Sequence, residues 1–192
     1  MMMAEICDCT GEPECGCRFA SRRSVVAALA CTAVLPVMLR SAAAAPTAAD
    51  DERFMRIALE EARQAGFPFG AVIVRDGQAI ARGRNLNRAK DDPTAHGEMV
   101  AIHRCLAVYD RTVLVGSTLY TTGEPCAMCM GAILWCHFGR LVFAASVEQL
   151  ATRLDQIMIS SAEIARRAPF APIEISGGLL ADEAMALFPP RK

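Results

Sequence analysis

The 192-residue sequence has few aromatic residues and no large excess of either charge. Aromatic side chains make up 6% of the chain, and 20 Lys and Arg nearly balance 21 Asp and Glu, giving a formal net charge of −1. Proteins that hold nucleic acid mainly through its phosphates usually carry a basic patch, whereas the arginines here are scattered among acidic residues. The composition therefore argues against a large nucleic-acid partner and favours a small-molecule ligand.

The N-terminal part lacks an apolar run long enough to predict a stable membrane span. Residues 25–39 are apolar, but the run is shorter than the ~20 residues that usually cross a bilayer, and Pro36 interrupts it. Arg22 and Arg23 precede the run and a small-residue tract follows at 41–45, which is typical of a twin-arginine export signal. We therefore expect residues 1–46 to be removed and residues 47–192 to form a periplasmic domain. An uncleaved signal that anchors the protein in the membrane is the alternative.

Histidine is scarce, and cysteine is unevenly distributed. The chain has three His and nine Cys, and five of the cysteines lie in the expected signal segment. Four of these form two Cys-x-Cys pairs, and we assign them no role because cleavage would discard them: Cys7, Cys9, Cys15 and Cys17. In the expected domain, Cys105 and Cys136 are interpreted as buried helix residues, with a disulfide as the alternative in an oxidising compartment.

The strongest chemical signal is Cys126-Ala127-Met128-Cys129, read together with His96-Gly97-Glu98. A lone Cys-x-x-Cys also occurs in redox pairs and structural zinc sites, but no second Cys-x-x-Cys or His-x-x-x-His follows to complete a closed site. Two thiolates and one imidazole suit zinc and leave one tetrahedral position free, as in catalytic sites. We therefore predict zinc on His96, Cys126 and Cys129.

Glu98 has the position expected of an acid/base group beside this metal. A zinc ion with a free position lowers the pKa of its bound water to about 7, and a nearby carboxylate can take the proton and return it to the leaving group. His-x-Glu followed by Pro-Cys-x-x-Cys is the signature of zinc nucleobase deaminases. One difficulty is that residues two apart do not share a helix face, so His96 and Glu98 meet only if the helix end points into the cleft.

Strand-like and helix-like segments alternate after an initial hairpin. This pattern predicts an α/β fold with helices on both faces of one mostly parallel sheet. The expected strands are 71–75, 79–83, 118–121, 141–144 and 173–175, and the expected helices are 50–65, 94–109, 125–136, 148–167 and 181–187, with 85–93 irregular. Asp50–Asp51 and Thr94 are candidate caps, and Pro125 suits a first helical position.

Three segments together resemble the cytidine/deoxycytidylate deaminase superfamily, and its purine branch most closely. They are Asp92-Pro93-Thr94-Ala95-His96-Gly97-Glu98, Gly123-Glu124-Pro125-Cys126-Ala127-Met128-Cys129-Met130-Gly131-Ala132 and Gly177-Gly178-Leu179-Leu180-Ala181-Asp182-Glu183. The resemblance implies a three-layer α/β/α fold with a five-stranded mixed sheet, a homodimer, and Glu98 as the proton shuttle. Gly97 replaces the alanine that is commoner in the family, a change from which we expect little consequence.

The resemblance also implies which residues contact the substrate. Asn85 corresponds to an asparagine that hydrogen-bonds the base, with a plain turn residue as the alternative. Trp135 falls where guanine deaminases carry a tryptophan, or is a core residue. Phe69, with Phe67, lines the base pocket or packs under the sheet, and Asp155 corresponds weakly to an acid that contacts the substrate in guanine deaminases.

We therefore expect a zinc-dependent hydrolase that releases ammonia from a nucleobase-like small molecule, guanine first. A tRNA adenosine deaminase is the alternative within the same chemistry, although export of the protein argues against it. A protein of the same fold that contains zinc but binds its ligand without turnover is the alternative from another class.

Overall fold

The structure is a computed structural model that describes residues 47–191. These residues form one sheet with strand order β2-β1-β3-β4-β5. The strands are β1 Gly70–Arg75, β2 Gln78–Arg84, β3 Thr118–Gly123, β4 Arg140–Ala145 and β5 Glu174–Ser176. The helices are α1 Ala48–Arg63, α2 Asn87–Lys90, α3 Gly97–Leu106, α4 Ala127–Trp135, α5 Val147–Ala151, α6 Ser161–Arg167 and α7 Ala181–Met185, with a short 3-10 helix at Arg111–Val113.

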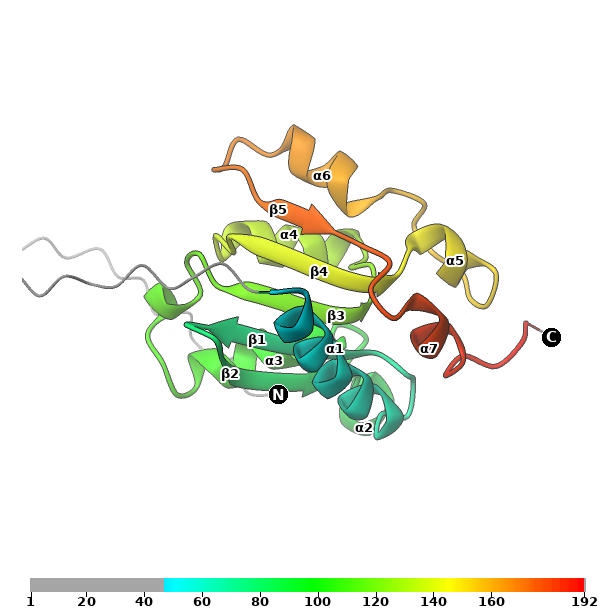
Figure 1. Ribbon diagram of the computed structural model, residues 1–192. Coiled ribbons are helices and arrows are strands. Elements are labelled where there is room, and N and C mark those ends of the chain that lie inside the picture. Colours follow the sequence, from blue (N-terminus) through cyan, green and yellow to red (C-terminus); the bar gives the residue numbers. More distant parts are fainter. Residues whose placement is uncertain (1–46, 192) are drawn as a thin grey trace, which may run out of the picture. The chain divides into compact units, whose positions relative to one another are not determined.

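The sheet is the middle of three layers, as the resemblance implied (Figure 1). Alternate side chains of a strand point to opposite faces, and β1 shows the division clearly. Val72 and Val74 pack with residues of α1 and α7 in one apolar cluster. Ala71 and Ile73 pack with residues of α3 and α4 in a second cluster. Both faces of the sheet are therefore buried under helices.

The sheet is mixed, which confirms the five-stranded mixed sheet that the resemblance implied, whereas the mostly parallel sheet predicted from the alternation of elements is wrong. β1 pairs antiparallel with both β2 and β3, while β3–β4 and β4–β5 are parallel. The hairpin predicted around residues 76–77 accounts for one antiparallel pair. The other arises because β3 joins the free edge of β1 in the opposite direction, which the alternation of elements did not reveal.

Three predicted helix starts are wrong by a few residues. Thr47 caps α1 through a capping box with Asp50, so Asp50 lies inside the helix. His96, not Thr94, is the N-cap of α3, and α4 begins at Ala127 after its N-cap Cys126, not at Pro125. All three cap positions have an extended backbone, and in α3 and α4 a zinc-ligand candidate occupies the cap position.

The predicted helix at 148–167 is two helices separated by a loop. Ser146 caps α5 with a capping box to Gln149, and Ser160 caps α6 by accepting the Glu163 N–H. Residues 152–160 between them form neither helix nor strand. The stretch predicted to be irregular contains the short helix α2.

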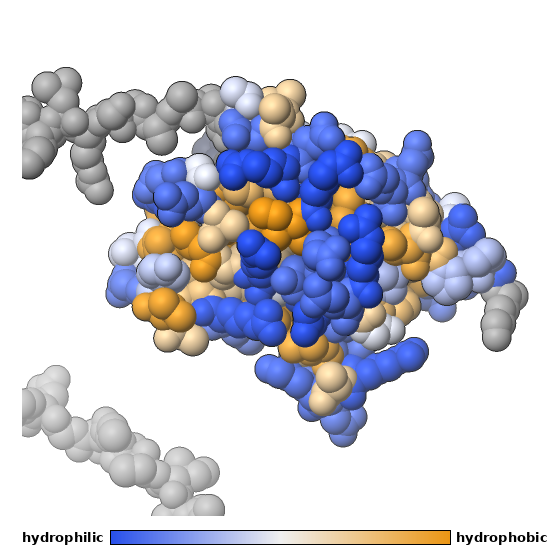
Figure 2. All heavy atoms as spheres, turned by 60° about the horizontal axis from the view of Figure 1, so that its bottom comes forward, coloured by the Kyte–Doolittle hydropathy of each residue, from blue (hydrophilic) through white to orange (hydrophobic). Residues whose placement is uncertain are grey.

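A close contact between α3 and β2 fixes the start of α3. A Cβ atom on Gly83 would lie 2.2 Å from the Gly97 carbonyl oxygen and 2.4 Å from the Ala101 nitrogen. Only glycine allows this approach of backbone to backbone, which places His96 beside the end of β2. β2 is an edge strand, and Figure 2 shows hydrophilic side chains over much of the face that carries it. Arg82 and Arg84 lie on this strand, and such charges discourage pairing with another sheet.

None of the helices between residues 47 and 191 is long and apolar enough to span a bilayer. The expected export signal and its two Cys-x-Cys pairs lie outside the described residues.

Candidate zinc-centred active site

The candidate site lies where α3 and α4 begin, next to the carboxyl end of β3. His96 is the residue before α3, Cys126 is the residue before α4, and Cys129 is in the first turn of α4. The parallel pairing of β3 with β4 places the ends of both strands at this edge of the sheet. Loops at such an edge are the usual position of ligand sites in α/β proteins.

The three side chains form a cluster of the size that one zinc ion requires. Their ligand atoms all lie within 4.8 Å of one another. The Nδ1 atom of His96 is 3.6 Å from the sulfur of Cys126 and 3.6 Å from that of Cys129. Zinc bonds of about 2.3 Å to sulfur and about 2.0–2.1 Å to nitrogen, held at tetrahedral angles, put nitrogen and sulfur about 3.6 Å apart. The donor set and its spacing therefore fit zinc with one position left for a ligand.

The backbone at His96 explains how His96 and Glu98 reach the same site. His96 has φ −68° and ψ 159°, which is extended and not helical, while Glu98 lies in the first turn of α3. The rule that side chains two residues apart lie on different faces applies only inside a helix. Because the chain turns into the helix between these two residues, both side chains line one pocket.

Hydrogen bonding favours a thiolate at Cys126. The Cys129 thiol and His96 both lie against its sulfur and lower the pKa of Cys126 to about 4. As the donor of this hydrogen bond, and as a buried group, Cys129 has its pKa raised. The N-terminus of α4 adds a favourable field for the anionic form, which is the form that binds metal.

Glu98 is a buried carboxylate with only 4% of its surface exposed. Burial, the largest cause, raises its pKa, and the nearby Cys126 thiolate acts in the same direction. A carboxylate whose affinity for protons is increased in this way is suited to accept a proton and then release it.

These residues open into a pocket of about 300 Å³. This is at the lower end of the roughly 300–1,000 Å³ of small-molecule sites, so it admits one base-sized group. The pocket is lined by Phe67, Phe69, Asn85, Asn87, His96, Glu98, Glu124, Cys126, Leu154, Asp155 and Gln156. Four of the predicted substrate residues, Asn85, Phe67, Phe69 and Asp155, are therefore gathered here with the zinc ligands His96 and Cys126.

A hydrogen bond orients Asn85, whereas the aromatic residues are held by packing against one another. Asn85 is buried, and its Oδ1 accepts the Asn87 N–H at 3.1 Å, which leaves the Nδ2 donors to face a ligand. Phe69 packs against Phe67 with ring centroids 5.5 Å apart and against Phe188 at 5.0 Å. The aromatic wall therefore depends on the C-terminal segment as well as on the loop before β1.

Asp155 and Trp135 lie in different surroundings from one another. The Asp155 carboxylate is at the pocket rim, 94% exposed, and pairs with Arg191 at 2.5 Å. Trp135 lies at the far end of α4, is 73% exposed, and packs against Phe170 instead of lining the pocket. Within one chain the structure does not bring Trp135 to the site, and its predicted contact with substrate stays a prediction.

Four pocket residues had no predicted role: Asn87, Glu124, Leu154 and Gln156. Glu124 was visible in the Gly-Glu-Pro-Cys run, but spacing alone gave it no role. Leu154 and Gln156 fall in the loop that the sequence suggested was helical, so no pattern pointed to them.

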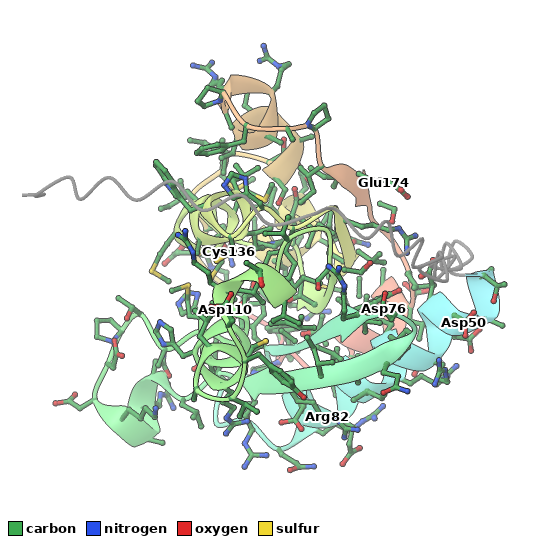
Figure 3. The ribbon with its side chains drawn as sticks, turned by 90° about the vertical axis from the view of Figure 1, so that its left-hand side faces the viewer. Asp50, Asp76, Arg82, Asp110, Cys136 and Glu174 are labelled. Carbon is green, nitrogen blue, oxygen red and sulfur yellow. The ribbon has the colours of Figure 1, made fainter. Side chains whose placement is uncertain are left out.

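The other cysteines of the described chain lie away from the ligand cluster. Cys105 and Cys136 are free thiols, so the structure holds no disulfide between them. Figure 3 looks at the end of the sheet that carries the β1–β2 turn at Asp76 and the start of β5 at Glu174, and Cys136 lies at this end. The zinc ligands occupy the opposite end.

Comparison with known proteins agrees with this geometry. Residues 48–145 match the cytidine and deoxycytidylate deaminase zinc-binding region. The tRNA-specific adenosine deaminase of Haemophilus influenzae is 46% identical over 101 residues, which cover 50% of this chain and 58% of that protein. The guanine deaminase of Bacillus subtilis is 48% identical over 80 residues, which cover 42% of this chain and 51% of that protein. The chain thus spans little more than half of these relatives.

Solved structures share the fold. A mutant protein in complex with 8-azaguanine superposes with a TM-score of 0.63 and 27% identity, covering 71% of this chain and 81% of that chain. That structure holds a nucleobase analogue.

Proposed function

Because the chain belongs to the cytidine and deoxycytidylate deaminase zinc-binding family, we propose that it is a zinc-dependent hydrolase that releases ammonia from a free nucleobase, guanine or a guanine-like purine first. The family consists of deaminases, which hydrolyse C–N bonds, and this chain carries the family's His/Cys/Cys zinc group. The observation that carries the proposal is the buried Glu98 carboxylate, which shares one base-sized pocket with His96 and Cys126.

Each group of pocket residues has its own role in the proposed reaction. His96, Cys126 and Cys129 would hold the zinc, which would supply a water of lowered pKa when bound. Glu98 would accept a proton from the attacking water and deliver it to the ring nitrogen beside the amino-bearing carbon. It would then move the remaining proton from the new hydroxyl group to the amino group, so that the C–N bond breaks and a carbonyl compound and ammonia form. Asn85 orients the base through its amide, and Phe67 and Phe69 exclude water from one face.

Two features support a free base over a base within a polynucleotide. The chain has a formal net charge of −1, without the basic excess that phosphate contacts favour. The pocket has a volume of about 300 Å³, which suits a single base-sized ligand.

A tRNA adenosine deaminase is the second candidate. The observation that favours it is the 46% identity to the Haemophilus influenzae enzyme over 101 residues. In such a protein the same pocket would receive an adenine turned out of an RNA loop.

Ammonia release from a substrate panel tests the proposal. The zinc-loaded protein is given guanine, adenine, cytosine, their nucleosides, and an anticodon stem-loop with adenosine at the first anticodon position. We expect guanine to give the highest kcat/KM. Turnover of the stem-loop alone would favour the second candidate. No turnover of any substrate by protein that contains zinc would favour a binding protein without activity.

We also propose that the protein is a homodimer. Met128 and Trp135 are seven residues apart on α4 and so share a face, and both are exposed. Ile157, Met158 and Ile159 are consecutive exposed apolar residues in the loop before α6. Monomers seldom expose many large apolar side chains together. Light scattering of the purified protein at several concentrations measures the assembly, and a monomer at all concentrations would contradict it.

Export to the periplasm through residues 1–46 remains a proposal from the sequence. Amino-terminal sequencing of the protein recovered from a cell fraction tests it. A mature N-terminus near Ala44 is expected, and an intact N-terminus would favour a retained segment.

A further inference from the structure

Glu124 is a buried carboxylate that the proposed chemistry does not use. It stands two residues before the zinc ligand Cys126, has 7% of its surface exposed, and contributes to the pocket wall. Its backbone position is fixed by the sheet, because its N–H donates to the Ala145 carbonyl at 2.7 Å, directly beyond the paired strands β3 and β4. A charged side chain in such a place requires partners.

The partners of Glu124 are the backbone amides of two helix starts. Oε2 accepts the N–H of Val147 at 2.9 Å, and Oε1 accepts the N–H of Ser161 at 2.7 Å. Val147 is the first residue of α5 and Ser161 is the first residue of α6. The first amides of a helix have no acceptor within the helix, and this end of a helix attracts negative charge. One carboxylate thus joins the N-termini of two helices.

These two helix starts bracket the part of the chain that forms the outer wall of the pocket. Residues 152–160 lie between α5 and α6, and Leu154, Asp155 and Gln156 from this loop line the pocket. A second link comes from the fully buried Ser161, whose hydroxyl lies 3.5 Å from the Pro125 carbonyl oxygen and donates to it. These hydrogen bonds connect Val147 and Ser161, on either side of the loop, to Glu124 and Pro125, the two residues before Cys126.

We infer that Glu124 is a positioning residue that fixes the 152–160 loop relative to the zinc ligands and so sets the affinity for substrate. The inference rests on the proposed function for the identity of the substrate, but the positioning itself does not. A carboxylate is required because both oxygens must accept. In glutamine one oxygen becomes an amide nitrogen, whose hydrogens would face a backbone N–H instead of accepting it.

The test compares Glu124→Gln with Glu148→Gln in the zinc-loaded full chain. Glu148 is exposed and lies in the first turn of α5. Glu148→Gln therefore makes the same chemical change at the same helix without removing the hydrogen bonds that Glu124 accepts. For Glu124→Gln we expect unchanged zinc content, a KM for guanine raised about tenfold and a kcat within about threefold of wild type. Hydrogen exchange of the amides in residues 147–161 should accelerate about tenfold or more. Glu148→Gln should match wild type in all four measurements.

Each other outcome has a defined meaning. Unchanged exchange and unchanged KM in Glu124→Gln would overturn the inference, as would a loss of zinc with kcat falling as much as kcat/KM. If wild type turns over no base, the proposed function fails, while hydrogen exchange still decides the positioning role. If Glu124→Gln does not fold, Glu124→Asp provides the same reading, since it keeps the charge but is one methylene too short to reach both amides.

Discussion

At the scale of single residues, two buried cysteines have opposite surroundings. Cys129 lies 3.6 Å from the His96 nitrogen, while Cys105 is buried in the apolar cluster between α3, α4 and the sheet. We predict that Cys129→Ser lowers zinc affinity roughly tenfold or more, because a thiolate ligand is lost. Cys105→Ser should keep its zinc and lose about 1–3 kcal/mol of stability. Zinc content after dialysis against a chelator measures this, and zinc loss in Cys105→Ser alone would contradict the assignment.

The ion pair between Asp51 and Arg140 predicts a specific response to acid. Arg140 Nη1 lies 2.6 Å from Asp51 Oδ1, and the Tyr120 hydroxyl donates to the same carboxylate at 2.6 Å. Arg140, then Tyr120, hold the pKa of Asp51 below its usual 3.8 despite partial burial. A depressed pKa in the folded protein stabilises it above the unfolded value, and this contribution is lost as the pH falls through the folded value.

We therefore predict that Asp51→Asn loses about 1–3 kcal/mol of unfolding free energy near pH 7. The difference from wild type should shrink as the pH falls below about 4. Urea unfolding at several pH values measures this difference in unfolding free energy. Asp76→Asn is the control, since the Asp76 side chain is 75% exposed and its contact with Arg75 is 3.6 Å long. An equal loss in both variants, or a gap that widens in acid, would refute the account.

At the scale of elements, the zinc ligand His96 depends on how closely α3 approaches β2. Gly83 permits that approach, because a Cβ there would overlap the α3 backbone at 2.2 Å. We predict that Gly83→Ala destabilises the protein by about 2–3 kcal/mol and weakens zinc binding, since the start of α3 must move. Gly131→Ala in α4 is the matched control, because no atom lies within 4 Å of its would-be Cβ. Thermal unfolding and zinc content compare the two, and an equal Tm would contradict the packing argument.

The helices and strands also show what a sequence can predict. Both zinc motifs were placed near helix starts, since His-x-Glu and Pro-Cys-x-x-Cys carry their own local signals. Their exact starts were misplaced because His96 and Cys126, which occupy the cap positions, are not usual capping residues. The break between α5 and α6 was missed because Glu124, far away in sequence, satisfies the amides of Val147 and Ser161.

At the scale of the whole molecule, the pocket is assembled from segments that lie far apart in the chain. Phe67 and Phe69 precede β1, Asn85 follows β2, and Leu154 to Gln156 come from the loop after α5. The metal cluster could be predicted because two short motifs contain all of it. The outer wall could not be predicted, because no periodic pattern marks residues 152–160 and their position depends on contacts made across the fold.

The rim of the pocket provides a prediction about the whole chain, because Arg191 joins the C-terminal segment to Asp155. Arg191 also donates to the Ala151 carbonyl at 3.3 Å. We predict that Arg191→Ala changes KM measurably, by up to about tenfold, while leaving the unfolding free energy within about 0.5 kcal/mol, since exposed pairs contribute little to stability. Arg166→Ala, on the exposed face of α6, is the control. Identical KM values in the wild type and both variants would show that the rim pair does not influence entry.

The most direct test of the central claim is ammonia release from guanine by Glu98→Gln compared with wild type, at equal zinc content. The account predicts about one zinc ion per chain in both proteins. It also predicts that the variant loses roughly 10²–10⁴-fold in kcat, because its amide cannot carry the proton from water to base. A zinc-loaded Glu98→Gln protein that deaminates guanine at the wild-type rate would contradict it.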